Sequence, residues 1–244
     1  MVMAREKTMT TEDNRGRIAR PAVVLLSGGL DSTTTLAWAV REGYRCDALT
    51  FTYGQRHDRE VACAELVARR FQVRKHLVVQ LDPALFRGSA LTGGASLPLD
   101  RRLEEMAKEI PATYVPARNT VFLASALAYA EQAGAFDIFI GANAIDFSGY
   151  PDCRPEFIAA FETLANLGTK AAVSGAGRFR IHAPLMTKTK AEIVDLAFEL
   201  GVDPGETWSC YSPQSSGRPC GRCDSCVIRD QAFQRAGRVD PLLR

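Results

Sequence analysis

The stretch that most constrains the fold is "LLSGGLDSTTTLAWA", residues 25–39, in which two glycines separate an apolar strand from a helix. Residues 21–26 form an apolar run typical of a buried strand, and residues 32–41 carry apolar side chains at helical spacing. A glycine-rich turn between a strand and a helix directs backbone N–H groups and the positive helix end toward one point, which suits a phosphate. An ordinary strand-to-helix turn that needs glycine for a positive φ is the alternative interpretation.

Strand and helix patterns alternate along most of the chain. Strands are predicted at residues 45–53, 75–81, 137–142 and 180–184, and helices at 59–71, 119–135, 157–167 and 189–200. Strands separated by helices of about a dozen residues are typical of right-handed βαβ units. We therefore predict an α/β fold with a doubly wound parallel sheet.

Local signals mark two helix starts and one irregular region. Asn119 is a candidate N-cap, and Thr189 with Glu192 forms a capping box. Residues 82–116 are interrupted by Gly, Ser and Pro and are predicted to be mainly a long loop. Residues 143–157 are rich in polar and aromatic side chains and follow the predicted strand 137–142. They therefore lie at the carboxyl end of a strand, which is where open α/β sheets bind ligands.

The length and charge of the chain limit its organisation and its partners. We expect a flexible N-terminal extension at residues 1–20, an α/β domain at 21–205 and a small C-terminal region at 206–244. The 30 Lys and Arg against 28 Asp and Glu give a formal charge of +2, which offers no general reason to bind nucleic acid or a membrane. Without an apolar run of 18 residues or the apolar core of a signal peptide, the protein is expected to be cytoplasmic.

Four of the seven cysteines lie within 17 residues near the C-terminus. An odd total in a chain expected in the cytosol argues against a disulfide framework. Four thiolates match a closed tetrahedral site, so we predict one structural zinc ion per chain. An iron–sulfur cluster also takes four cysteines, whereas a redox pair would need only two. The predicted ligands are Cys210, Cys220, Cys223 and Cys226, while Cys46, Cys63 and Cys153 are expected to serve packing.

The glycine turn differs from the two common nucleotide loops, since it is neither G-x-x-x-x-G-K-[ST] nor G-x-G-x-x-G. Residues 27–32, "SGGLDS", resemble the S-G-G-x-D-S signature of the PP-loop ATP pyrophosphatases. That resemblance implies a Rossmann-like sheet of the adenine nucleotide alpha hydrolase type and ATP cleavage that releases pyrophosphate. It places ATP, with Mg²⁺, on Leu26, Ser27, Gly28, Gly29, Leu30, Asp31, Ser32, Thr33, Thr34, Thr35 and Leu36.

Three side chains are predicted to act on the phosphates. The hydroxyl of Ser32 donates hydrogen bonds, and Asp31 is a candidate Mg²⁺ ligand, or alternatively a plain carboxylate at a helix start. Because the turn lacks a lysine, we assign the missing cation to Lys190, which opens a helix where anions are already favoured. Lys188 lies beside it, and the alternative is that both lysines are solvated. Asp31, Ser32 and Lys190 are thus the predicted catalytic residues.

A closer resemblance covers residues 22–242. The segments "FTYGQRH", "TYVPARNTVFL", "GANAIDFSGYPDCRPEF", "TWSCY" and "CGRCDSC" resemble those of the 7-cyano-7-deazaguanine synthases of queuosine precursor biosynthesis. The resemblance implies conversion of 7-carboxy-7-deazaguanine, ammonia and ATP to the nitrile. A carboxylate cannot expel oxide, so each oxygen is first adenylylated, and two ATP give two AMP and two pyrophosphates. We expect free ammonia as the nitrogen source, since no glutaminase domain accompanies the α/β unit.

Candidate substrate residues lie in three of the matching segments. A deazaguanine presents an N1–H and an exocyclic amine, which suit a carboxylate, and a flat face, which suits an aromatic ring or an arginine. Arginines can also hold a carboxylate or a phosphate in two hydrogen bonds. Each of these residues could instead serve as a cap or lie on the surface. The candidates are His57, Arg118, Asp146, Phe147, Tyr150, Asp152 and Arg154.

Two other functions fit parts of the sequence. A different PP-loop ligase or a tRNA-thiolating relative would also pair the loop with cysteines, but thiolation needs an exchange cysteine and a basic surface. A zinc-module interaction protein with a vestigial loop is the third option, although its tail would offer few aromatic side chains for stacking. We expect small-molecule substrates, no nucleic acid or membrane partner, and assembly as a homodimer.

Overall fold

The computed structural model describes residues 19–55, 58–93, 95–106, 110–143 and 149–243. Its centre is a five-stranded sheet in the order β3-β2-β1-β4-β5, and all neighbouring strands are parallel. This arrangement confirms the predicted doubly wound α/β fold. The strands are β1 (Arg20–Leu25), β2 (Tyr44–Thr52), β3 (Lys75–Gln80), β4 (Asp137–Phe139) and β5 (Arg180–His182).

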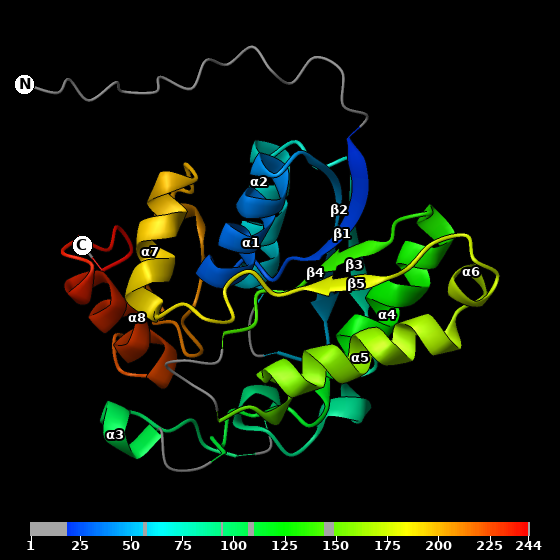
Figure 1. Ribbon diagram of the computed structural model, residues 1–244. Coiled ribbons are helices and arrows are strands. Elements are labelled where there is room, and N and C mark those ends of the chain that lie inside the picture. The colour runs from blue at the N-terminus through cyan, green and yellow to red at the C-terminus, as the bar shows by residue number, and fades with distance from the viewer. Residues whose placement is uncertain (1–18, 56–57, 94, 107–109, 144–148, 244) are drawn as a thin grey trace, which may run out of the picture.

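Helices cover both faces of the sheet (Figure 1). On one face lie α1 (Leu30–Arg41) and α2 (Arg59–Arg70), and on the other lie α4 (Arg118–Ala133) and α5 (Pro155–Gly168). The pair α7 (Lys190–Glu199) and α8 (Asp224–Arg235) packs beside α1. Shorter pieces are α3 (Leu103–Met106), α6 (Lys170–Val173), η1 (Pro83–Phe86), η2 (Ala90–Thr92), η3 (Pro151–Cys153) and η4 (Pro204–Glu206).

The two-residue period of β1 divides the core between the faces. Val23 and Leu25 pack against α4 and α5, whereas Ala22 and Val24 pack against α1 and α2. Every one of these four side chains is buried, as expected for a central strand of a parallel sheet. Burial on both faces is what makes β1 an apolar run in the sequence.

The start of α4 differs from the prediction. Asn119 is not the N-cap: that position belongs to Ala117, whose φ is 52°, and Asn119 lies inside the helix. The backbone N–H of Asn119 donates to Asp152 Oδ2 at 3.0 Å, and its Nδ2 donates to the Asp152 carbonyl at 3.0 Å. The Asp152 carboxylate therefore accepts from a first-turn N–H group of α4 that would otherwise need a capping side chain close by in the sequence.

The other helix signals give a mixed outcome. The capping box of Thr189 and Glu192 is present and opens α7, as predicted. Residues 82–116 contain only short turns and α3 among the described positions, in agreement with the predicted loop. Helices α6 and α8 were not predicted. No helix in the described part of the chain combines the length and apolar character needed to span a membrane.

The strand order places a crevice above the sheet. The chain runs outward from β1 to β3 and returns to β4 on the other side of β1, so the switch in direction lies between β1 and β4. Ligands of open α/β sheets bind at such a switch point, beyond the carboxyl ends of the strands. Gly141, just after β4, permits the close approach: a Cβ there would lie 3.1 Å from Ser32 N and Ser32 Cα.

Candidate active site

The glycine turn that follows β1 is shaped by its contact with α2. Gly28 has a φ of 85°, and a Cβ at this position would lie 2.1 Å from the Glu60 carbonyl oxygen and 2.7 Å from Ala64 N. Gly28 is therefore required for packing as well as for its positive φ. Gly29 is the extended N-cap of α1 and has no such clash.

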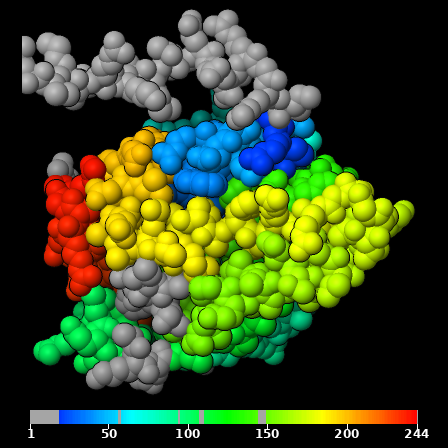
Figure 2. All heavy atoms as spheres, in the orientation of Figure 1, coloured from blue at the N-terminus to red at the C-terminus, as the bar shows by residue number. Residues whose placement is uncertain are grey.

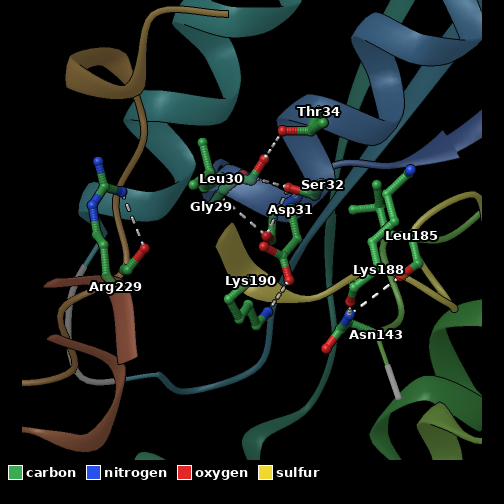
Figure 3. A network of polar contacts seen from close by, with 12 residues as sticks. Gly29, Leu30, Asp31, Ser32, Thr34, Asn143, Leu185, Lys188, Lys190 and Arg229 are labelled. Atoms are coloured by element: carbon green, nitrogen blue, oxygen red, sulfur yellow. Dashed lines mark hydrogen bonds and ion pairs between the residues drawn. The ribbon is translucent and has the colours of Figure 1, made fainter. Parts of the chain in front are cut away.

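The two serines of the turn bond to each other and to its backbone, and Figure 3 shows Ser32 beside Gly29 and Asp31. Ser27 Oγ and Ser32 Oγ are 3.0 Å apart, and Ser32 Oγ also accepts from Ser27 N at 3.1 Å. Ser32 Oγ donates to the Gly29 carbonyl at 3.1 Å, and Ser27 Oγ accepts from Gly29 N at 3.3 Å. These bonds hold both hydroxyls at the mouth of the crevice, where both serines line the cavity.

The hydroxyls further along α1 have a different environment. Thr34 Oγ1 donates to the Leu30 carbonyl within the helix at 2.8 Å. Thr33 Oγ1 and Thr35 Oγ1 are buried and have no hydrogen-bond partner among the described residues. Leu36 is fully buried against the sheet. The structure thus brings the first part of the predicted nucleotide segment to the crevice and places Thr33 to Leu36 behind it.

A lysine from α7 reaches the glycine turn. Lys190 Nζ forms an ion pair with Asp31 Oδ2, and Figure 3 shows the two side chains pointing toward each other from different helices. Both side chains are about one quarter exposed. Lys188 is not among the residues that line the cavity beside the turn, and its carbonyl accepts from Asn143 Nδ2. Of the two lysines, it is therefore Lys190 that supplies a positive charge at the turn.

A cavity of about 350 Å³ opens beside the turn, within the size range of small-molecule sites. Its inner wall is aromatic and includes Tyr53, Phe122, Tyr150 and Tyr211. Arg118, at the start of α4, also lines the cavity and donates to the Tyr53 hydroxyl at 3.2 Å. The cavity therefore joins a polar mouth at the glycine turn to an aromatic and cationic wall.

The other predicted substrate residues occupy several environments. Tyr150 lies in the cavity wall and shares a 2.9 Å hydrogen bond with Thr113. Asp152 is buried and engaged with Asn119, and Arg154 is exposed at the N-cap of α5. Neither Asp152 nor Arg154 lines the cavity. His57, Asp146 and Phe147 lie outside the described residues.

The cavity also contains side chains that the sequence analysis did not single out. Glu60, in the first turn of α2, lines the wall beside the turn, and burial raises the pKa of its carboxyl to about 7 while the charge of Arg118 opposes part of that shift. Asp224 lines the wall contributed by α8. A carboxylate shortly after the end of β2 is a signal that could have identified Glu60, because that sheet edge binds ligands.

The four clustered cysteines form a compact group suited to a metal ion. Their sulfur atoms all lie within 4.8 Å of one another, and the sulfurs of Cys220 and Cys226 are 3.9 Å apart. A tetrahedral zinc ion with bonds of about 2.3 Å requires sulfur atoms about 3.8 Å apart. Backbone N–H groups of Cys220 and Cys223 donate to sulfur at 3.2 and 3.3 Å, which stabilises thiolate charge. The donor set fits the predicted metal site.

The cysteine region and the cavity are physically connected. Trp208 N donates to the Gly28 carbonyl at 2.9 Å, so the segment before the cysteines holds the glycine turn. Asp224 follows Cys223 directly and forms a two-pronged ion pair with Arg101. The cysteine cluster therefore lies next to one wall of the cavity and is tied to it through Trp208 and Asp224.

Comparison with known proteins settles the family. A family described as "Queuosine biosynthesis protein QueC" matches residues 21–237, a range that includes the glycine turn, the lysine of α7 and all four clustered cysteines. The chain belongs to the QueC family.

Individual members of the family resemble the chain over nearly its whole length. A protein of Frankia casuarinae named 7-cyano-7-deazaguanine synthase is 55% identical over 93% of this chain and 95% of its own. A Geobacter metallireducens protein of the same name is 57% identical over 91% of this chain and 92% of its own. Among solved structures, NMN synthetase from Francisella tularensis aligns with a TM-score of 0.47 at 17% identity, over 91% of this chain and 79% of that one. The family resemblance drawn from the sequence motifs is confirmed.

Proposed function

We propose that this QueC family member converts 7-carboxy-7-deazaguanine and ammonia to 7-cyano-7-deazaguanine, with cleavage of ATP to AMP and pyrophosphate. The observation that carries the proposal is the identity of 54 to 57% with curated relatives named for this synthase activity, each matched over at least nine tenths of its length. The family match over residues 21–237 includes both the glycine turn and the residues that line the cavity.

The polar mouth of the cavity supports activation by ATP. The hydroxyls of Ser27 and Ser32 and the turn backbone would bind the terminal phosphates, and Lys190 would neutralise part of their charge. Asp31 offers the carboxylate oxygen that Mg²⁺ prefers, and the ion would shield phosphate charge when bound. Held in this way, the α-phosphorus is open to attack by the substrate carboxylate, and pyrophosphate is the leaving group.

The aromatic wall supports binding of a planar base. Phe122 and Tyr150 offer ring faces for stacking, and Arg118 can hold the substrate carboxylate in two hydrogen bonds. We retain His57, Asp146, Phe147, Asp152 and Arg154 as candidate substrate contacts. Asp152 and Arg154 would need a rearrangement of the 150–154 segment to reach the cavity, because they point elsewhere in this structure.

The four cysteine sulfurs would hold one structural zinc ion. Four protein ligands complete a tetrahedron and leave no position for substrate, so the ion would stabilise the cavity wall and take no part in the chemistry. Metal analysis of the purified protein tests this assignment. One zinc per chain and a colourless protein are expected, whereas iron with visible absorption would indicate an iron–sulfur cluster.

We also propose that the protein acts in the cytoplasm as a homodimer on small molecules alone. Leu164 and Leu167 of α5 are 55% and 75% exposed, and α5 lies open along the face shown in Figure 2. Exposed apolar side chains on one helix support a contact with a second copy. Light scattering during size-exclusion chromatography should give twice the 26.6 kDa chain mass, and tRNA should not co-elute.

The function is tested by product analysis. The protein is incubated with ATP, Mg²⁺, ammonia and 7-carboxy-7-deazaguanine, and the nucleotides and bases are resolved by mass. AMP together with the nitrile is the expected result, and Lys190→Met should reduce it strongly while the matched variant Lys188→Met should not. ADP as the product would contradict adenylylation, and no turnover of this base would contradict the proposed substrate.

A further inference from the structure

Amide formation in the proposed reaction requires a proton acceptor. The nitrogen lone pair of ammonia attacks the acyl carbon of the adenylylated acid, a C–N bond forms, and the C–O bond to AMP breaks. AMP leaves with the electron pair of that bond, and the nitrogen must lose one proton to give the neutral amide. A positioned side chain that accepts this proton accelerates such a step.

Three carboxyl groups line the cavity in the described part of the chain, and two of them are paired. Asp31 forms an ion pair with Lys190, and Asp224 forms one with Arg101. The Glu60 carboxylate makes no hydrogen bond or ion pair with any described residue. Of these three groups, Glu60 is therefore the one whose carboxylate has no hydrogen-bonded partner among the described residues that line the cavity.

The backbone of α2 fixes Glu60 beside the glycine turn. Its carbonyl packs directly against Gly28, at a place where even a methyl group would not fit. The side chain is only partly exposed and lies in the same cavity wall as Ser27 and Asp31. We propose that Glu60 accepts the proton from the attacking ammonia nitrogen in the amide-forming step, an inference that rests on the proposed function.

The environment of Glu60 suits a proton acceptor at neutral pH. Burial raises the pKa of its carboxyl to about 7, and the positive charge of Arg118 limits the rise. Among the described residues, Cys63 and Tyr211 also interact with its charge, and burial raises the pKa of each above its ordinary value. The Cys63 thiol and the Tyr211 hydroxyl are therefore neutral at pH 7, and of these three groups only the Glu60 carboxylate can accept a proton.

Two partial reactions separate this role from binding. Adenylylation of a carboxylate removes no proton, so exchange of labelled pyrophosphate into ATP, dependent on 7-carboxy-7-deazaguanine, reports on binding and activation alone. Glu60→Gln should keep this exchange within about threefold of wild type, yet slow amide formation from ammonia by about 10²–10⁴-fold. At a fixed concentration of unprotonated ammonia, the rate of amide formation should rise with pH and level off above about 7 in wild type, and Glu60→Gln should lose that titration.

Controls make the outcomes distinct. Glu65→Gln changes an exposed carboxyl on the same helix and should match wild type in both assays. Glu60→Asp retains a carboxylate and should recover part of the rate and its pH dependence. An equal loss of exchange and amide formation in Glu60→Gln, or a normal rate of amide formation, would overturn the role of Glu60. Wild-type protein without any acid-dependent exchange would refute the proposed function itself.

Discussion

Replacement of Gly28 by alanine tests how the glycine turn is built. The substitution should lower the unfolding free energy in two ways, through strain in the backbone and through a clash of the new Cβ with α2. A non-glycine residue at a φ of 85° costs about 1–2 kcal/mol. The Cβ would also lie 2.1 Å from the Glu60 carbonyl and 2.7 Å from Ala64 N, and because both are helix backbone atoms, α2 itself must move. Overpacking of this kind costs about 1–3 kcal/mol, so the total is about 2–5 kcal/mol.

Gly43 provides the matched control, because it shares the backbone conformation but not the contact. Its φ is 81°, and a Cβ there would meet nothing within 4 Å. Gly43→Ala should therefore lose only about 1–2 kcal/mol of unfolding free energy. The difference between the two variants isolates the packing penalty at Gly28.

Urea unfolding of both variants measures these losses by linear extrapolation. We expect Gly28→Ala to lose at least about 1 kcal/mol more than Gly43→Ala, and to lose AMP formation at a temperature where both variants remain folded. Equal losses of unfolding free energy would refute the packing argument. Unchanged AMP formation in Gly28→Ala would show that the turn tolerates displacement from α2.

Three further predictions concern buried charge, the metal and pH. Asp240→Ala leaves the Arg229 guanidinium buried without its carboxylate partner and should lower the unfolding free energy, measured in urea, by about 3–5 kcal/mol. Asp195→Ala breaks the exposed ion pair with Arg238 and should lower it by less than about 1 kcal/mol. Cys223→Ser should lose the bound metal, measured by elemental analysis, and lower the melting temperature. The pKa of the Glu60 carboxyl rises from 4.5 to about 7 on folding, so between these pH values the folded state binds more protons than the unfolded state. As the pH is raised from 4.5 to 7, the unfolding free energy of the wild type should therefore fall relative to that of Glu60→Gln, by on the order of 3 kcal/mol.

The regular elements near the sheet could be predicted because their burial has a period. The strand that became β1 is apolar from Pro21 to Leu25, and the helix that became α7 opens with a local capping box, so both signals lie within a few residues. Helix α8 was missed for the opposite reason. It carries the candidate metal ligand Cys226 and two buried charged residues, Asp224 and Arg229, in place of a clean apolar stripe. Its helical state depends on partners that are distant in the sequence.

The same distinction holds for the candidate site. The motif placed Ser27, Asp31 and Ser32 at the crevice, and the helix start placed Lys190 there, because each depends on one local turn. The role of Asp152 depends instead on Asn119, which lies 33 residues away. A pairing at that separation is set by how η3 packs on α4, and no periodicity in the sequence encodes it.

The most direct test of adenylylation follows the two carboxylate oxygens of the substrate. When 7-carboxy-7-deazaguanine carries ¹⁸O at both positions, each oxygen should be expelled on an adenylyl group. Mass spectrometry should then find two AMP molecules per nitrile, each with one ¹⁸O atom. Unlabelled AMP, or label in inorganic phosphate with ADP as the nucleotide product, would contradict the account.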